Sequence, residues 1–386
     1  MNKVRKICVV IANRANYARI KSVLRAIKEQ DGLGLQLIVN ASALLTRFGN
    51  VSEVIQADGF EITEKVHVVI EGETPSTMAK STGLGIIEMA TAFENLKPDI
   101  VLTVADRFET MATAIAASYM NIPLAHTQGG DVTGSIDESV RHAITKLSHI
   151  HFPATEASLQ RIVRLGENPE LIFNVGCPSI DLILDCDLKK DPQYIVDRPI
   201  GVGVRLSTSE PFVMVLQHPV TTEYGDGIWQ VEEILRAVHR LKMQTIVFWP
   251  NADAGSEEVA CGIRRFREHQ KDLDIFRFFI NLPPEDFILL MNHAKCLVGN
   301  SSAFIREGTF LGTPVVNIGS RQSGRERGEN VVDVPVNEEK IYQAIQSQIQ
   351  HGHYPQNYLF GNGGSGRKIS KILSECKVNI QKKLNY

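Results

Sequence analysis

The sequence predicts an α/β protein with two Rossmann-like domains. The chain has 386 residues, more than the roughly 250–300 residues at which a single hydrophobic core stops growing. Short apolar runs alternate with segments whose apolar residues recur at helical spacing, which is the pattern of a parallel sheet wound by helices. This alternation occurs in both halves of the chain without a residue-level repeat, so we expect two similar domains.

The first half alternates between expected strands and expected helices. Its strands are expected at residues 7–12, 35–40, 66–69, 100–104, 123–126 and 151–153. Its helices are expected at residues 17–29, 51–57, 77–94, 109–119, 138–149 and 156–165. This order of elements indicates a parallel sheet with helices on its faces.

The second half repeats this order of elements. Its strands are expected at residues 212–217, 245–249, 296–298 and 315–318. Its helices are expected at residues 228–241, 256–269 and 285–292, with a further helix that runs through residue 310 and a last one at residues 367–384. Residues 187–210 are rich in Asp, Pro, Gly and Arg and are the best candidate for a linker. We therefore expect an N-terminal domain over 1–180, a C-terminal domain over 181–366 and a closing helix over 367–386.

The composition is that of a globular protein and argues against several classes. With 43% hydrophobic residues, 22% charged residues and a formal net charge of −3, the chain shows no sign of a nucleic-acid or membrane partner. It has no run of about 18 apolar residues to span a bilayer, and its first apolar run lacks a signal-peptide cleavage site. The six cysteines are scattered, so we expect reduced thiols in a cytoplasmic protein and no metal site.

Titratable side chains are concentrated in residues 126–142, directly after an expected strand. The segment holds three carboxylates, two histidines and one arginine, and it should lie at the carboxyl edge of the sheet, where open α/β folds bind ligands. Asp137 and Arg141 are four residues apart and can share a helix face, which fits either a surface salt bridge or a site. The other titratable residues of the segment are His126, Asp131, Glu138 and His142.

Ser301 and Ser302 follow an expected strand and open an expected helix. A helix N-terminus favours phosphate, although a serine there also acts as an ordinary N-cap. Arg321 and Arg325, just beyond the next strand, add positive charge suited to phosphate. The chain has neither a P-loop motif nor G-x-G-x-x-G after its first strand, which argues against a kinase, an ATPase or a dinucleotide-dependent dehydrogenase.

His218 and the pair Asp106-Arg107 also stand directly after expected strands. A lone histidine is more often structural than catalytic, and Asp106-Arg107 fits a structural ion pair as well as a functional one. Because each stands at a sheet edge where other polar chemistry is expected, both the structural and the functional interpretation stay open for these residues.

Seven motifs carry a resemblance to a known family. They lie at residues 14–17, 106–109, 129–142, 176–179, 217–222, 250–256 and 299–302. On these motifs the chain resembles the hydrolysing UDP-N-acetylglucosamine 2-epimerases of sialic-acid pathways. The resemblance runs from about residue 5 to about residue 375, and several of its motifs are long.

The resemblance implies two Rossmann-like domains of the glycosyltransferase-B type with a UDP-sugar between them. The family eliminates UDP from UDP-N-acetylglucosamine to give a 2-acetamidoglucal, and then adds water to release N-acetylmannosamine, with no metal or nicotinamide cofactor consumed. By position, Asp106 and Asp137 would be the acid and base, and His218 would face the diphosphate and help the leaving group. A homo-oligomer, a dimer or a tetramer, is implied as well.

The resemblance also implies a substrate-binding set. Phosphates would be held by Arg14, Ser301, Ser302 and Arg321. Glu307 would suit the ribose hydroxyls, and Arg141 would orient the carboxylates. The remaining residues expected at the substrate are Arg107, His126, Glu138 and Asn251.

Gln128 departs from the family pattern, in which a catalytic glutamate stands two residues after the strand-end histidine. An amide cannot exchange protons as a carboxylate does at neutral pH. Either Gln128 positions the substrate while Asp131 or Asp137 transfers the proton, or the substrate is a related one, UDP-2,4-diacetamido-2,4,6-trideoxyglucose. A UDP-sugar glycosyltransferase and a non-catalytic UDP-sugar binder on the same architecture stay open as alternatives.

Overall fold

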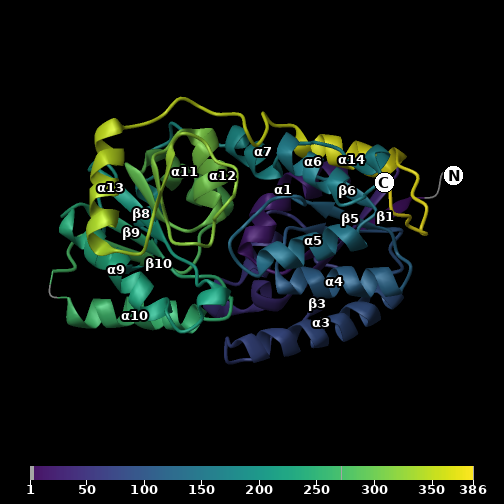
Figure 1. Ribbon diagram of the computed structural model, residues 1–386, viewed down its shortest axis with the longest axis horizontal. Helices are drawn as coiled ribbons and strands as arrows, with labels where there is room; N and C mark the ends of the chain where they lie inside the picture. Colours follow the sequence, from purple (N-terminus) through teal and green to yellow (C-terminus); the bar gives the residue numbers. More distant parts are fainter. Residues whose placement is uncertain (1–3, 271, 386) are drawn as a thin grey trace.

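The computed structural model describes residues 4–270 and 272–385. Residues 1–3 and 386, which the expected domains include, lie outside this part of the chain. Two separate sheets, each wound by helices, lie side by side (Figure 1), which confirms the predicted fold class. None of the helices in the described part of the chain is long and apolar enough to cross a membrane.

The first sheet has six parallel strands within the described residues, in the order β3-β2-β1-β4-β5-β6. Its strands are β1 (Arg5–Ile11), β2 (Leu33–Asn40), β3 (Glu64–Val66), β4 (Ile100–Val104), β5 (Leu124–Thr127) and β6 (Ile150–Phe152). Its helices are α1 (Arg14–Glu29), α2 (Val51–Ala57), α3 (Pro75–Leu96), α4 (Phe108–Tyr119), α5 (Asp137–Leu147) and α6 (Glu156–Arg164). This is the Rossmann strand order, which reverses between β1 and β4.

The second sheet has seven strands within the described residues, in the order β13-β12-β11-β8-β9-β10-β7. They are β7 (Val202–Gly203), β8 (Phe212–Leu216), β9 (Gln244–Phe248), β10 (Phe276–Phe279), β11 (Cys296–Gly299), β12 (Val315–Ile318) and β13 (Val331–Val334). The helices that follow α6 along the chain are α7 (Pro178–Asp185), α8 (Gln193–Val196), α9 (Gly227–Arg240), α10 (Ser256–His269), α11 (Pro284–His293), α12 (Ser302–Leu311), α13 (Glu338–His351) and α14 (Ser365–Glu375), and α14 packs against α1 of the first domain. Here the order reverses between β8 and β11.

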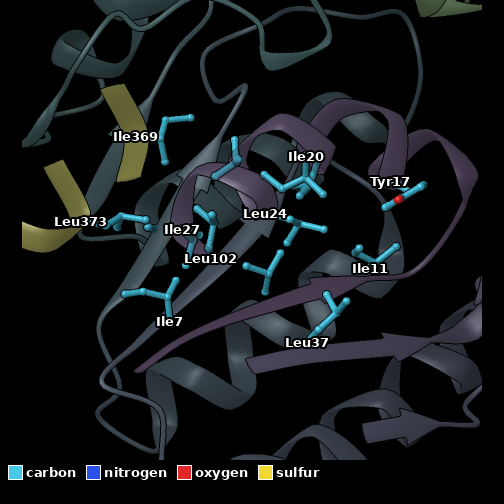
Figure 2. Close-up of a cluster of buried hydrophobic side chains, with 14 of the residues drawn as sticks. Ile7, Ile11, Tyr17, Ile20, Leu24, Ile27, Leu37, Leu102, Ile369 and Leu373 are labelled. Atoms are coloured by element: carbon cyan, nitrogen blue, oxygen red, sulfur yellow. The ribbon is translucent and has the colours of Figure 1, made fainter. Parts of the chain in front are cut away.

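The first domain has one core cluster between its sheet and α1, and another between the sheet and helices α3, α4 and α5. Ile20, Leu24 and Ile27 recur at helical spacing on α1 and are fully buried against the sheet. Ile369 and Leu373 of α14 join the same cluster (Figure 2), so the end of the chain returns to the first domain. Each such buried side chain contributes roughly 1.5–3 kcal/mol of transfer free energy.

Two expectations about chain connections were wrong. Residues 187–210 are not a bare linker, because α8 buries Ile195 and Val196 in a core cluster of the second domain and β7 pairs antiparallel with β10. The closing helix α14 ends at Glu375, earlier than expected, and the following residues run without helix along the first domain. The boundaries near residues 180 and 366 stay a prediction.

Candidate active site

The candidate site lies in a cleft between the carboxyl ends of the two sheets. Two adjoining cavities, with volumes of about 800 Å³ and about 630 Å³, open there. They share the lining residues Ala15, Ala18, His218, Asn251, Ser301, Ala303 and Glu307. The chain enters this lining directly after β1, β4, β8 and β11, the strands at which the order of each sheet reverses. This is where open α/β sheets bind ligands.

The two cavities differ in chemical character. The larger one is lined mainly by apolar side chains of both domains, among them Val51, Phe248 and Phe287. The smaller one is lined by charged and hydroxyl side chains from both domains. Among the described residues, no group of three or more His, Cys, Asp and Glu side chains is placed to hold a metal ion.

Asp106 is fixed in the smaller cavity by Arg141. Arg141 is fully buried; its Nε donates to Asp106 Oδ2 at 3.0 Å and its Nη2 to the same oxygen. Burial by itself would raise the pKa of Asp106, but the charges of Arg141, Arg19 and Arg325 outweigh it, and the pKa lies well below its usual range. Asp106 is therefore ionised at any working pH.

Asp137 has a different environment at the N-terminal end of α5. Of the two interpretations left open for Asp137 and Arg141, the surface salt bridge does not form among the described residues, and Asp137 Oδ2 lies 3.7 Å from Arg321 Nη2 of the second domain. Burial and the negative charge of Asp106 raise the pKa of Asp137 to about 6, against the opposing effect of Arg321. Two carboxylates in one cavity with pKa values pushed apart are typical of acid–base chemistry.

His218 is a neutral hydrogen-bond donor at the junction of the two cavities. Its backbone is held by Asn300, whose side chain accepts from His218 N–H at 2.7 Å and donates to its carbonyl at 2.8 Å. Burial, then Arg321 and Arg14, lower the pKa of His218 well below its usual range. Because Nδ1 accepts the backbone N–H of Asn251 at 3.2 Å, the ring proton is on Nε2.

The N-terminus of α12 provides polar groups beside His218. Ser301 caps this helix by accepting from Ala303 N–H at 3.3 Å. Ser302 Oγ accepts from Arg19 Nη2 at 2.6 Å and from Arg306 Nη2 at 3.0 Å. A helix N-terminus with arginines around it attracts phosphate. Arg19 escaped the sequence analysis because it stands in the middle of α1, away from any strand end.

Arg14 and Arg107 reach across the cleft to the second domain. Arg14 Nε donates to Asn251 Oδ1 at 2.8 Å, and its Nη atoms donate to the carbonyls of Ile280 and Trp249. Arg107 Nη1 lies 2.5 Å from Asp253 Oδ1. Both side chains border the cavities, but their donors are largely used in holding the domains together.

Asp131 of the first domain links the two domains by ion pairs with arginines of the second domain, next to the smaller cavity. Its Oδ2 accepts from Arg325 Nη1 at 2.9 Å and lies 3.4 Å from Arg306 Nη1, while Oδ1 accepts from Ser158 Oγ at 3.0 Å. Burial by itself would raise the pKa of Asp131, but these arginines outweigh it and lower the pKa. A carboxylate held this way is suited to an interdomain ion pair rather than to proton transfer.

His126 and Glu138 were expected at the substrate, but their side chains make hydrogen bonds within the protein that fix the segments after β4 and β5. Neither is among the described residues that line the two cavities. Glu138 Oε2 accepts from Thr133 N–H at 2.7 Å and from Arg141 Nη1 at 3.1 Å. His126 is fully buried and donates from Nε2 to the carbonyl of Ala105 at 2.7 Å. The sequence showed their proximity to the site but not which way they point.

Glu307 and Gln322 have oxygens free for a ligand. Glu307 lines both cavities and Gln322 the smaller one, and neither Glu307 Oε2 nor Gln322 Oε1 has a hydrogen-bond partner among the described residues. The amide of Gln322 is oriented by donation to the carbonyl of Asn300 at 2.8 Å. Buried polar atoms are rarely left unpaired, so both oxygens are candidates for ligand contacts. Gln322 was missed because a single glutamine in a loop gives no pattern.

Gln128 is buried beneath the site, and neither cavity has it among its described lining residues. Its Nε2 donates to Cys177 Sγ at 3.2 Å, and Cys177 Sγ lies 3.0 Å from Ser179 Oγ. Gln128 Oε1 has no partner among the described residues. The amide therefore packs beneath the loop that follows β5, against Cys177, at a position where the family pattern has a carboxylate.

We expect Gln128→Glu to destabilise the fold without raising turnover. The new carboxylate would be buried beside a thiol, and leaving a buried polar group unsatisfied lowers the free energy of unfolding by about 1–3 kcal/mol. Thermal unfolding and kcat are the measurements, with Gln128→Met as the matched uncharged control. A kcat above that of the wild type would instead give this position a part in proton transfer.

Three relatives and two solved structures are similar to the whole chain. Residues 25–374 match the family model described as UDP-N-acetylglucosamine 2-epimerase. The UDP-N,N'-diacetylbacillosamine 2-epimerase (hydrolyzing) of Legionella pneumophila is 33% identical, covering 98% of each chain. The GDP/UDP-N,N'-diacetylbacillosamine 2-epimerase (hydrolyzing) of Campylobacter jejuni is 30% identical over 97% of this chain and 96% of the relative. The UDP-N-acetylglucosamine 2-epimerase of Neisseria meningitidis is 28% identical over 97% and 95%.

The solved structures support the fold. A UDP-GlcNAc 2-epimerase from Neisseria meningitidis bound to UDP-GlcNAc superposes with a TM-score of 0.78 at 18% identity, covering 95% of this chain and 99% of that one. A structure of S. aureus MnaA with UDP superposes with a TM-score of 0.77 at 18% identity, covering 99% and 100%. Both comparisons extend over both Rossmann-like domains.

Proposed function

Because the chain belongs to the UDP-N-acetylglucosamine 2-epimerase family, we propose that it is a hydrolysing 2-epimerase that converts UDP-N-acetylglucosamine to N-acetylmannosamine and UDP. The observation that carries this proposal is the carboxylate pair Asp106 and Asp137, which line one cavity in opposite electrostatic environments beside the N-terminus of α12. Elimination and hydration at a sugar ring need a group that exchanges protons near neutral pH and a place for the departing diphosphate.

Asp137 acts as the base in this proposal. It takes the proton from C2 of the sugar, the C2–H electrons form the C1=C2 double bond, and the C1–O bond breaks with its electrons passing to the β-phosphate oxygen of UDP. Water then adds to the double bond: its oxygen bonds to C1 and its spare proton passes to solvent, while a solvent proton adds to the opposite face of C2, and Asp137 loses the abstracted proton to solvent. Asp106 stays ionised and stabilises the positive charge that develops at C1.

The second domain holds the leaving group. His218 donates its Nε2–H to the diphosphate, and Ser301, Ser302 and the N-terminus of α12 lie where phosphate oxygens would be held. Arg19 and Arg321 supply charge from either side of the cavity. Glu307, with its unpaired Oε2, suits the ribose hydroxyls, and the apolar cavity beyond it suits the uracil base.

A second substrate has a specific argument in its favour. The two relatives at 33% and 30% identity over nearly the whole chain both carry the name of a diacetylbacillosamine epimerase, whereas the relative named for UDP-N-acetylglucosamine is 28% identical. UDP-2,4-diacetamido-2,4,6-trideoxyglucose would undergo the same reaction at C1 and C2, since its additional acetamido group is at C4.

The test is a product assay with both UDP-sugars. We expect free UDP and a 2-epimerised free sugar from at least one of them without any acceptor, and the substrate with the higher kcat/KM is the natural one. UDP release only after an acceptor sugar is added would mean a glycosyltransferase. Tight UDP binding with no turnover of either sugar would mean a non-catalytic binder.

We also propose that the enzyme is a cytoplasmic homo-oligomer. All six cysteines are unpaired in the described structure, in keeping with a reducing compartment. Ile87 on α3 and Tyr119 on α4 are 64% and 87% exposed, on two helices that pack against each other, and we propose this pair of helices as the contact between copies. Sedimentation that finds only monomers at micromolar concentration would contradict the oligomer.

A further inference from the structure

His126 is the one histidine of the site segment that is completely buried, and it contacts two elements that carry the catalytic ion pair. Its Nε2 lies 2.7 Å from the carbonyl oxygen of Ala105, the residue directly before Asp106. Its Nδ1 lies 3.4 Å from the hydroxyl of Thr145 on α5. Thr145 is four residues after Arg141 and so lies one turn further along the same helix face.

The peptide that His126 holds is a strained one. Ala105 has a φ of +61°, in the left-handed region that residues with a Cβ rarely adopt. The N–H of Ala105 donates to the carbonyl of Thr127 at 3.2 Å, so both backbone groups of Ala105 are bound to β5 or to its side chains. Strained residues of this kind persist only where their surroundings fix them, and they cluster at active sites.

The tautomer of His126 follows from its partners. Burial lowers the pKa of His126 to about 4, so the ring is neutral at neutral pH and carries a single N–H. A carbonyl oxygen only accepts hydrogen bonds, which assigns the proton to Nε2. The Thr145 hydroxyl then donates to Nδ1.

We propose that His126 is a positioning residue for the reaction: by holding the Ala105 carbonyl with its Nε2–H and meeting Thr145 on α5, it sets where Asp106 and Arg141 meet at the sugar. This inference rests on the proposed epimerase function. It assigns to His126 an action through Asp106 rather than a contact with substrate, which the sequence had suggested.

The test compares His126→Gln with His126→Asn. The side-chain N–H of glutamine extends about as far as the histidine Nε2, whereas that of asparagine extends only as far as Nδ1. We expect His126→Gln to keep most of the wild-type kcat and His126→Asn to lose about 10²-fold, the size of effect that a displacement of about 1 Å produces. KM and the affinity for UDP should change little in either variant.

A matched control is His151→Gln. His151 pairs with His126 in the β5–β6 register and is equally buried, but it contacts Glu167 at 3.2 Å and not the strand end at Asp106. We expect this variant to lower thermal stability and leave kcat unchanged. Equal kcat in the two His126 variants, whether both high or both low, would overturn the proposal.

A readout that does not depend on turnover separates this inference from the proposed function. Amide hydrogen exchange across residues 104–108 should be faster in His126→Asn than in the wild type, and unchanged in His126→Gln. If the wild type turns over no UDP-sugar but exchange follows this order, the epimerase function fails and the role of His126 in holding Ala105 stands. Exchange that is the same in all three proteins would overturn it.

Discussion

Replacing Asp137 with asparagine is expected to lower kcat by about 10²-fold or more, the usual contribution of a positioned acid–base group. Asparagine keeps the size of the side chain but cannot take a proton. UDP should still bind, because the α12 N-terminus and His218 lie on the second domain and are unchanged. The measurement is kcat together with the UDP dissociation constant from calorimetry. A wild-type rate in Asp137→Asn would remove this group from the mechanism.

The pH dependence of kcat/KM tests the same role of Asp137, because kcat/KM reports the pKa of groups in the free enzyme. A base must be deprotonated, and the pKa of Asp137 is raised to about 6 in this structure, so kcat/KM should be half-maximal near pH 6, reach a plateau above about pH 7 and fall as the pH drops further. The charged groups facing Asp137 are Asp106, Arg321, Asp253 and Arg107. Asp106→Asn should lower kcat by a similar factor. It should also shift the acidic fall in kcat/KM to lower pH, because it removes a negative charge that raises the pKa of Asp137.

Replacing Gly134 with alanine is expected to lower kcat by about 10²-fold, since small displacements at an active site have effects of this size. Gly134 N–H donates to the carbonyl of Arg321 at 3.0 Å. A Cβ at this position would lie 2.0 Å from the backbone oxygen of Ser320, a distance that no side-chain rotation relieves. The loop of the second domain would have to retreat, taking Arg321 away from Asp137 and Arg325 away from Asp131.

Gly83→Ala is the matched control for that loop contact. Gly83 lies within α3 with nothing within 4 Å of an added Cβ, and alanine in a helix interior is favoured over glycine by roughly 0.5–1 kcal/mol. We expect this variant to keep the wild-type rate. If Gly134→Ala also kept it, the two loops would not need to meet during turnover.

Much of the fold followed from the sequence because strands and helices alternate with clear periodicity. The strands that were missed lack this signal, whereas helix α13 was missed although Ile341, Ile345 and Ile349 recur at helical spacing. β10 is only four residues long and carries Arg277 among its phenylalanines, and β13 leaves its two middle residues exposed. β7 has two residues, so its pairing with β10 became visible only in three dimensions, and the segment around it resembled a linker.

The candidate site was predictable in its location and less so in its contacts. The carboxyl ends of parallel strands share an edge of each sheet, and residues that follow β4 in the first sheet and β8 and β11 in the second line one cleft because these two edges face each other. The partners within the cleft come from distant parts of the chain. The i,i+4 rule paired Asp137 with Arg141, but Arg141 bonds Asp106 and Asp137 faces Arg321 across the domain interface. Spacing along one helix carries no information about the second domain.

The central claim, that the sugar loses and regains a proton at C2 while UDP departs, is tested most directly by turnover of UDP-N-acetylglucosamine in D₂O. The free sugar is then analysed by mass spectrometry and NMR. We predict N-acetylmannosamine with one deuterium at C2, because the proton added to the glucal comes from solvent. Release of UDP together with N-acetylglucosamine that carries no deuterium at C2 would contradict the elimination mechanism and with it the roles given to Asp106 and Asp137.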